Sequence, residues 1–252
     1  TAWHELIITT DADCVVSPEW IRSVVGYFEV NQPAMLVMPV ALKREKGLFA
    51  ELQMLEMAGL TAIAGGSLSQ GKPMMCNGAN LAFKRTEWMQ LMSGSTSGYS
   101  SGDDTDLLYK MHERSSEKVQ YLSGRDVVVT TEPVKGAAAY FSQRHRWSSK
   151  IAGTMSSFTI AVAVLAWLTH FFLLYYFIHS LIDFHFPLTF VSAWLIKAFA
   201  ESMVIGPAMK LTSELRPDRM VLLLQPLYWF YVTVIGPAGL FLSFRWKGRK
   251  TR

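Results

Sequence analysis

The sequence predicts an α/β domain that is followed by α-helical transmembrane segments. Three observations favour this fold class. Residues 5–10 form a short β-branched and apolar run typical of a buried strand, and acidic side chains follow it directly. A helical pattern and a second apolar run over residues 34–42 come next, which is the strand–helix–strand order of a parallel sheet. Residues 155–178 contain no charged side chain and are long enough to cross a bilayer.

The composition excludes several classes of protein. The chain has 252 residues, of which 50% are apolar and 17% are charged. Its mean hydropathy of +0.20 is high for a soluble globular protein. These values exclude a disordered tail, a collagen-like fibre and a small disulfide scaffold. The two cysteines, Cys14 and Cys76, form neither a disulfide framework nor a Cys-x-x-Cys metal site.

The positive charge is concentrated in the second part of the chain. Residues 1–150 contain 15 basic and 16 acidic side chains, whereas residues 151–252 contain 9 basic and 4 acidic ones. The basic excess therefore lies among hydrophobic segments, where Lys and Arg mark the cytoplasmic face of a membrane. We expect a membrane as a partner and no nucleic acid.

The first strand begins almost at once, without a preceding signal peptide. A single strand–helix–strand unit cannot bury both faces of its sheet. We therefore expect further strands upstream of Thr1 and a sheet that is only partly contained in this sequence.

Other elements of the α/β part follow from apolar periodicity and turn residues. Ser17 and Pro18 suit the N-cap and the first turn of a helix that runs to about Val30. The remaining expected elements are an amphipathic helix over 47–63 ended by Gly65 and Gly66, a strand over 74–84, a mobile Gly/Ser-rich loop over 93–102, a helix from Asp103, a strand over 126–131 and an amphipathic helix over 138–151.

Three apolar runs follow. The run over 155–178 is the clearest transmembrane helix. The run over 186–207 is weaker because Lys197 and Glu201 interrupt it, although these two side chains can pair on one helical face. The run over 220–244 is broken by proline and glycine at Pro226, Gly236, Pro237 and Gly239. The predicted domains are a partial α/β domain (1–137), an interfacial helix (138–153) and a transmembrane region with a basic tail (154–252).

The basic residues conflict with three full crossings. Lys and Arg precede the first run, follow the second and fill the tail, but they are absent from residues 179–185. The positive-inside rule places all three basic regions in the cytoplasm. One run is therefore expected to be re-entrant, and the third is the candidate.

Asp11 and Asp13 directly follow the first strand. Two carboxylates at a strand end can chelate a divalent cation that carries a diphosphate on its other side. The pattern alone is not specific, because Asp104 and Asp106 form a second copy and acid pairs also serve as loop or helix-cap residues. The strand context favours the first copy as the metal site.

Asp103 and Asp104 stand at the expected start of a helix. The helix dipole favours acids there, which is one explanation. The other is that one carboxylate accepts a proton from an attacking hydroxyl.

Gln143, Arg146 and Trp147 have the spacing i, i+3 and i+4, so they share one helical face. Arg146 can bind a diphosphate through paired N–H groups, and Trp147 can stack on a sugar ring. An interfacial helix that contacts lipid headgroups explains the same residues. In Asn77-Gly78-Ala79-Asn80 the asparagines can bind hydroxyls or only complete a turn, and the turn is favoured.

In this order, the motifs resemble a membrane-bound glycosyltransferase of family 2 with the GT-A fold. The resemblance covers about residues 5–150 and includes the Q-x-x-R-W pattern of Gln143, Arg146 and Trp147. The tail from Trp246 to Arg249 resembles the ending of ceramide-glucosyltransferase-like members. The upstream Asp that holds the nucleotide base in this family has no counterpart here, so the Rossmann-like GT-A sheet is expected to be truncated at its N-terminus.

The resemblance implies a role for each matching residue. Asp11 and Asp13 correspond to the motif that binds Mn²⁺ or Mg²⁺ and the nucleotide sugar, with Asp13 favoured as the direct ligand. Asp104 corresponds to the catalytic base. Gln143 and Arg146 correspond to donor-binding residues near the diphosphate. Acceptor-binding roles fall to Trp147, Asp103 and Asn80.

The implied activity is inverting transfer of a sugar from a nucleotide sugar, by family default a UDP-sugar, to a lipid or glycan acceptor. The protein would be an integral membrane protein with its catalytic domain in the cytoplasm. One alternative is a processive polysaccharide synthase, which needs a channel built from several spans. Another is a non-enzymatic membrane transporter or sensor, for which Lys197 and Glu201 would be the functional charges.

Overall fold

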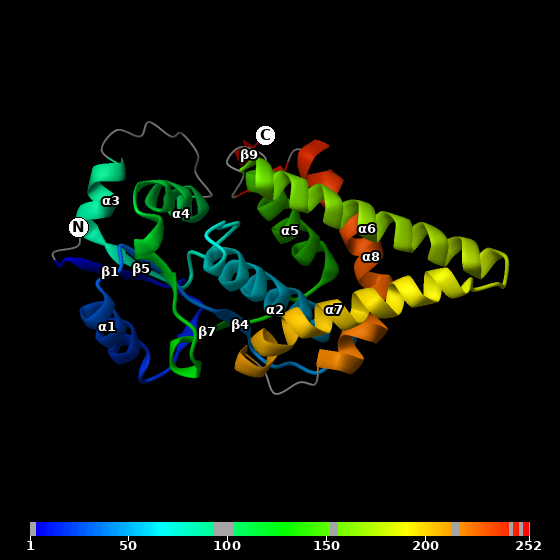
Figure 1. Ribbon diagram of the computed structural model, residues 1–252, viewed down its shortest axis with the longest axis horizontal. Coiled ribbons are helices and arrows are strands. Elements are labelled where there is room, and N and C mark those ends of the chain that lie inside the picture. Colours follow the sequence, from blue (N-terminus) through cyan, green and yellow to red (C-terminus); the bar gives the residue numbers. More distant parts are fainter. Residues whose placement is uncertain are drawn as a thin grey trace. The chain divides into compact units, whose positions relative to one another are not determined.

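A computed structural model describes residues 4–92, 103–151, 156–212, 217–241, 244–246 and 249–251. The chain divides into two compact units. The first comprises Thr1–Pro133 with Pro207–Leu215, and the second comprises Val134–Gly206 with Arg216–Arg252. The α/β elements fall in the first unit and the long apolar helices mostly in the second (Figure 1).

The main sheet of the first unit is mixed and has the strand order β1-β5-β3-β6. Its strands are β1 (Leu6–Thr9), β3 (Met35–Val37), β5 (Leu81–Lys84) and β6 (Val119–Tyr121). β5 is antiparallel to both β1 and β3, and β3 is parallel to β6. β1 and β3 therefore run in the same direction, as the strand–helix–strand pattern predicts, but β5 lies between them.

A second, smaller sheet has the order β2-β7-β4. It contains β2 (Val15–Val16), β4 (Val40–Leu42) and β7 (Val129–Thr131). The single strand predicted over 34–42 is therefore wrong: it is two strands in two sheets, separated by Met38 and Pro39. Proline has no N–H to donate to a ladder, which explains the change of sheet at this point. The strand expected over 126–131 is confirmed only in its second half.

Helices cover both faces of the main sheet. Alternate residues of β3 point to opposite sides: Leu36 packs with α1 (Trp20–Asn31), and Met35 and Val37 pack with α4 (Asp103–Arg114). Figure 1 shows α1 and α4 on opposite sides of β1 and β5. Because both faces are covered, the central strand β3 is apolar and buried at every position rather than alternating.

The helix boundaries correct two expectations. α1 begins at Trp20 rather than at Pro18, because Ser17 forms a turn in which its Oγ accepts from the Glu19 N–H at 3.2 Å. α2 (Leu48–Ser69) continues past Gly65 and Gly66, which the sequence suggested would end it. Most of its residues from Ala50 to Ala58 are buried, so packing outweighs the low helix propensity of two glycines. α3 (Arg85–Met92) completes the helices before the segment 93–102, which lies outside the described residues.

Tyr121 provides a pH-dependent test of this core. Its ring lies against α2 so closely that a Cβ at Gly65 would be 2.8 Å from the ring carbon Cε1. Burial raises the pKa of Tyr121 to about 12, above the ordinary value of 10. The unfolded chain therefore loses this proton first, and the stability that the protonated phenol contributes is lost as pH rises from 10 through 12.

We expect Tyr121→Phe to remove this alkaline sensitivity, because phenylalanine keeps the ring but has no proton to lose. The measurement is the melting temperature of wild type and variant at pH 8 and pH 11. The variant should lose less on going to pH 11. Equal losses in both proteins would show that Tyr121 is not held protonated by burial.

The second unit consists mainly of helices. α5 (Ala137–Ile151) precedes α6 (Ser157–Ile182), α7 (Leu188–Thr212) and α8 (Pro217–Phe241), and a short hairpin of β8 (Phe244–Trp246) and β9 (Arg249–Thr251) follows. α6 and α7 are long and apolar enough to cross a membrane. The third run was expected to be broken, but α8 continues through Pro226 and Pro237. Apolar helices tolerate internal proline when neighbouring groups satisfy the freed carbonyls.

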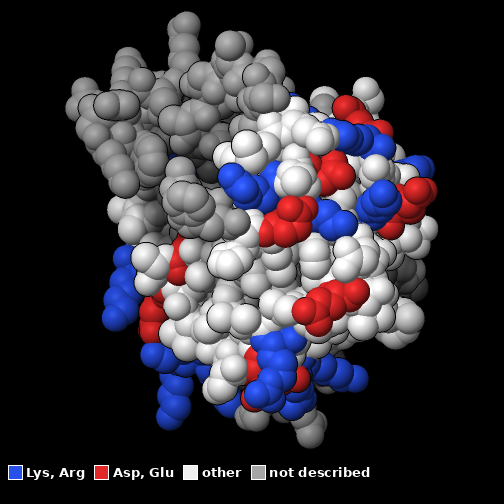
Figure 2. Space-filling model, turned by 90° about the vertical axis from the view of Figure 1, so that its left-hand side faces the viewer, with Lys and Arg blue, Asp and Glu red and all other residues white. Residues whose placement is uncertain are grey.

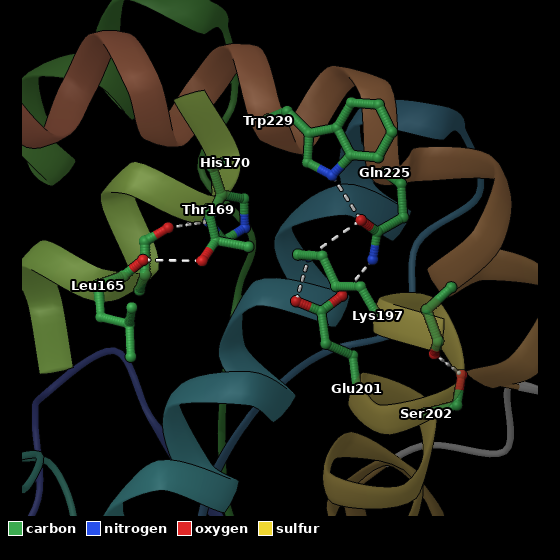
Figure 3. A network of polar contacts seen from close by, with 10 residues as sticks. Leu165, Thr169, His170, Lys197, Glu201, Ser202, Gln225 and Trp229 are labelled. Carbon is green, nitrogen blue, oxygen red and sulfur yellow. Dashed lines mark hydrogen bonds and ion pairs between the residues drawn. The ribbon is translucent and has the colours of Figure 1, made fainter. Parts of the chain in front are cut away.

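The charges of α7 are satisfied within a polar network that also involves α8 (Figure 3). Lys197 Nζ donates to Glu201 Oε1 at 2.5 Å and to Gln225 Oε1 at 3.0 Å. The Gln225 amide donates to the second Glu201 oxygen, and the Trp229 indole N–H donates to Gln225 Oε1 at 2.6 Å. Two opposite charges that neutralise each other in this way can reside among apolar helices. This pairing explains how Lys197 and Glu201 can interrupt the apolar run over 186–207.

Charged side chains of both signs mix on the face shown in Figure 2. Exposed ion pairs of the first unit include Arg22 with Glu19 at 2.8 Å and Lys43 with Glu132 at 2.7 Å. This mixture agrees with the near-zero formal charge of residues 1–150.

Candidate active site

One edge of the main sheet gathers the candidate residues of the first unit. The register pairs Thr9 with Leu81, and Val37 with both Leu81 and Tyr121. The C-terminal ends of β1, β3 and β6 therefore lie beside the N-terminal end of β5. Asp11 and Asp13 follow β1, and the segment 77–80 precedes β5, so the sheet brings these two motifs to the same edge.

Asp11 and Asp13 lie in a tight turn after β1. The turn is closed by the Cys14 N–H, which donates to the Asp11 carbonyl at 3.1 Å. Both carboxylates are exposed, and one ligand atom from each of Asp11, Asp13 and Cys14 lies within 4.8 Å of the others. Carboxylate oxygens at such spacing suit a divalent cation such as Mn²⁺ or Mg²⁺.

Cys14 was expected to be only structural, but its Sγ lies 4.0 Å from Asp13 Oδ1. Partial burial, followed by the charges of Asp13 and Asp11, raises the pKa of the Cys14 thiol. The thiol is therefore protonated near neutral pH. The sequence shows that Cys14 follows Asp13, but it does not show that the Cys14 thiol points toward the Asp13 carboxylate.

Asp104 stands in the first turn of α4, and two backbone N–H groups hold its carboxylate. Oδ2 accepts from the Gly78 N–H at 3.0 Å, and Oδ1 accepts from the Thr105 N–H at 2.9 Å. Gly78 is also held on its other side, because Thr9 Oγ1 donates to the Gly78 carbonyl at 2.8 Å. A chain of two hydrogen bonds thus connects the end of β1, two residues before Asp11, with Asp104.

Cys76 lies buried near Asp104. Burial, and after it the charge of Asp104, raise the pKa of the Cys76 thiol well above its ordinary value. The thiol therefore stays neutral next to the carboxylate. Asp103 is the first residue of α4, as the sequence predicts.

Asn80 is buried in the core, which argues against its expected contact with an acceptor. Its side chain is fully buried, and Nδ2 donates to the Pro39 and Val127 carbonyls at 2.7 and 2.8 Å. Its Oδ1 accepts from the Trp20 indole N–H at 3.2 Å. With both amide N–H groups used inside the core, Asn80 is a structural residue that joins the two sheets to α1. Of the two sequence interpretations, the turn fits: the Asn80 N–H donates to the Asn77 carbonyl at 3.0 Å.

Replacing Asn80 by Ala should destabilise the first unit strongly. The indole N–H of Trp20 and two carbonyls would lose their partner inside the core, a cost of about 3 kcal/mol in total. This corresponds to a melting temperature lower by about 6–12 °C. The matched control is Asn31→Ala, which removes an exposed asparagine whose Nδ2 donates to the Tyr27 carbonyl. Thermal unfolding that is equally affected in both variants would contradict the structural role of Asn80.

The Q-x-x-R-W residues lie on α5, in the second unit. The structure places Arg144, a residue that the motif does not include, at the centre of this group. Arg144 is buried, its side chain donates to Gln143 Oε1, and its guanidinium lies 4.5 Å from the Tyr140 ring centre and 4.2 Å from that of Trp147. Trp147 therefore has a cation stacked on one face. The sequence analysis considered only the helical face that carries Gln143, Arg146 and Trp147. It therefore missed the contact between Arg144 and Trp147.

Gln143, Arg146 and Trp147 are partly buried on the same helix. Their convergence with Asp13 and Asp104 stays a prediction, because α5 and the acid-bearing edge belong to different units. The loop 93–102, expected to close over the site, lies outside the described residues, as do Lys247 and Gly248 of the tail motif.

The fold and the acid-bearing sheet edge describe an α/β enzyme domain that is joined to long apolar helices. The model of a protein family described as glycosyltransferase like family 2 matches residues 1–149. That match covers more than half of the chain, and the chain belongs to glycosyltransferase family 2. No curated protein matches the chain.

Proposed function

We propose that the protein is an inverting, metal-dependent glycosyltransferase that moves a sugar from a UDP-sugar to a hydroxyl of a lipid or glycan acceptor at the cytoplasmic membrane face. Membership of family 2 supports the class of reaction. The observation that carries the proposal is the carboxylate of Asp104, which is held by backbone N–H groups beside the strand end that bears Asp11 and Asp13.

Asp11 and Asp13 would hold the divalent cation. They fit it because their oxygens are hard ligands, are exposed to an incoming diphosphate and are held by one turn. The bound cation would stabilise the negative charge of the departing nucleoside diphosphate. Arg146 and Gln143 are proposed to bind the same diphosphate, since a guanidinium matches phosphate oxygens through paired N–H donors.

Asp104 is the proposed base. As the acceptor oxygen attacks the anomeric carbon, its proton passes to a carboxylate oxygen of Asp104. The new carbon–oxygen bond forms while the bond between the anomeric carbon and the diphosphate oxygen breaks, which inverts the anomeric centre. The nucleoside diphosphate leaves with the electron pair. Trp147 is proposed to support the acceptor through its ring face. Asp103, which precedes the base in the sequence, is proposed to bind the same acceptor.

The apolar helices support a membrane location for this reaction. Large apolar side chains point outward along α6 and α7, including Leu165, Phe172, Ile196 and Phe199, each at least half exposed. Surfaces of this kind are stable in lipid rather than in water. Two crossings by α6 and α7 would place Lys135–Lys150 and Lys210–Arg219 on the same side, which satisfies the positive-inside rule without a third crossing.

For the acceptor, we favour the transfer of a single sugar to a lipid. A processive synthase remains the alternative, and product length on a gel separates the two: one added sugar supports single transfer, and a ladder of products supports processive synthesis. The polar contacts of Lys197 and Glu201 with each other and with Gln225 provide a structural role for the charges on which the transporter alternative relied.

The test is turnover of labelled nucleotide sugars by membranes that contain the full-length protein. UDP-glucose, UDP-galactose, UDP-N-acetylglucosamine and a GDP-sugar control are incubated with Mn²⁺, and lipid-extractable label is counted. We expect Mn²⁺-dependent label from one UDP-sugar. If no donor is consumed above the level of membranes that lack the protein, the proposed activity is wrong.

A further inference from the structure

Gly78 occupies a central position at the acid-bearing edge. Its N–H donates to Asp104 and its carbonyl accepts from Thr9, so its two backbone groups connect the strand that leads to Asp11 with the helix that begins at Asp103. We infer that Gly78 is a positioning residue, which fixes the direction of the Asp104 carboxylate relative to the turn of Asp11 and Asp13. The inference rests on the proposed function, because it assigns Gly78 to the orientation of the proposed base.

The contact between Gly78 and Asp104 is too close for a methyl group at position 78 unless the carboxylate gives way. A Cβ at position 78 would lie 3.3 Å from Asp104 Oδ2, 3.5 Å from its Cβ and 3.7 Å from its Cγ. The first distance is shorter than ordinary van der Waals contact, so a methyl group would displace the carboxylate by a few tenths of an ångström. Among the described glycines, positive φ occurs at Gly47, Gly71 and Gly136, so backbone strain does not explain glycine at position 78.

The backbone of Gly78 cannot easily retreat to accommodate a methyl group. On one side, Asn77 Oδ1 accepts from the Ala79 N–H at 3.1 Å, which closes a local turn. On the other side, the side chain of Asn80 is fixed in the core by bonds to Pro39 and Val127. The Thr9 hydroxyl holds the carbonyl of Gly78 itself. The displacement is therefore expected at Asp104.

The middle of α4 is anchored at a second point, to the chain shortly before Gly78. Tyr109, five residues after Asp104, donates from its hydroxyl to the Met74 carbonyl at 2.9 Å. The helix as a whole is thus held in place, and a methyl group at position 78 would rotate the Asp104 side chain rather than shift α4. Small misplacements of a reacting group lower the rate of the chemical step while they leave remote binding contacts intact.

We therefore expect Gly78→Ala to lower kcat by about 3- to 10-fold, because the displacement is a fraction of an ångström, with the KM for the UDP-sugar within about twofold of wild type. Binding of UDP with Mn²⁺, measured by calorimetry, should be unchanged. The matched control is Gly26→Ala in α1, where a Cβ would have no neighbour within 4 Å. This control should retain wild-type kcat.

A second pair of variants tests the same chain of bonds without adding a methyl group at position 78. Thr9→Val removes the hydroxyl that holds the Gly78 carbonyl and keeps the β-branched shape, whereas Thr9→Ser keeps the hydroxyl. We expect kcat to fall by about 3- to 10-fold in Thr9→Val and to be restored in Thr9→Ser, because without the hydroxyl the Gly78 backbone no longer holds the N–H that orients Asp104. If Gly78→Ala does not fold, the comparison of Thr9→Val with Thr9→Ser tests the positioning role of Gly78 instead.

The double variant Gly78→Ala with Asp104→Asn distinguishes the inference from the proposed function. If Gly78 acts through Asp104, adding Gly78→Ala to Asp104→Asn should cause no further loss of residual transfer. A kcat of Gly78→Ala equal to wild type, with Asp104→Asn inactive, would overturn the positioning role alone. An active Asp104→Asn would instead overturn the proposed base.

Discussion

Asp104→Asn is expected to lower sugar transfer by about 10²–10⁴-fold, the range that a general base contributes. The asparagine carbonyl oxygen can still accept from the Gly78 N–H, and only the bond from the neighbouring Thr105 N–H is lost, so the fold around α4 should persist. What is lost is the ability to take the proton of the acceptor hydroxyl. Initial rates with the UDP-sugar, together with calorimetric binding of UDP and Mn²⁺, measure the two effects separately. Transfer should collapse and UDP binding should not.

Asp106→Asn is the matched control for this variant. Asp106 lies on the same helix, two residues further on, and pairs with Lys110 at 2.7 Å. The pair is partly exposed and spaced i, i+4, so its loss should cost about 0.5 kcal/mol or less. Transfer by Asp106→Asn should stay near wild type. A comparable loss in both variants would indicate that charge at the start of α4, rather than a base at position 104, is what the reaction requires.

Asp13→Asn should abolish the metal dependence of donor binding. A divalent cation contributes several kcal/mol of charge stabilisation to a diphosphate, and every 1.4 kcal/mol is tenfold in affinity. Because an amide is a neutral ligand, we expect the affinity for UDP in the presence of Mn²⁺ to fall by about 100-fold or more. Calorimetry with UDP at several Mn²⁺ concentrations measures this loss, and Asp11→Asn should behave similarly with a smaller effect.

The control here is Glu29→Gln, which neutralises an exposed carboxylate near the C-terminal end of α1. Its UDP affinity should equal that of wild type. If Asp13→Asn retains Mn²⁺-dependent UDP binding, the cation is held elsewhere. If neither wild type nor variant binds UDP, the nucleotide is wrong and the same titration with GDP becomes the test.

The sequence predicted local elements better than their pairing. The apolar runs of α6 and α7 and the first strand were found because hydrophobic periodicity is a local property. The position of β5 between β1 and β3 was missed, because register is decided by contacts between residues far apart in the sequence, such as Thr9 with Leu81 and Val37 with Leu81. Similarly, the change of sheet at Pro39 and the continuation of α2 through Gly65 depend on the neighbours against which they pack.

For the site, residue types could be predicted and side-chain directions could not. The acid pair after β1 and the acids at the start of α4 were found from their places next to a strand and a helix. Asn80 was assigned to an acceptor because an amide close to a glycine in the sequence suits either a hydroxyl or a turn, and only its burial decides between them. The glycine at position 78 indicated a close backbone approach, but its partner Asp104 lies 26 positions further on and could not be identified from the sequence. Arg144 was missed because its contacts with Tyr140 and Trp147 depend on the direction of its side chain.

The most direct test of the account is a structure of the full-length protein with UDP and Mn²⁺. We predict that the metal lies between the carboxylates of Asp11 and Asp13 and the diphosphate, that Arg146 contacts the diphosphate, and that Asp104 faces the space where an acceptor hydroxyl would reach the anomeric carbon. A metal bound away from Asp13, or an Asp104 and an Arg146 that face away from the nucleotide, would contradict it.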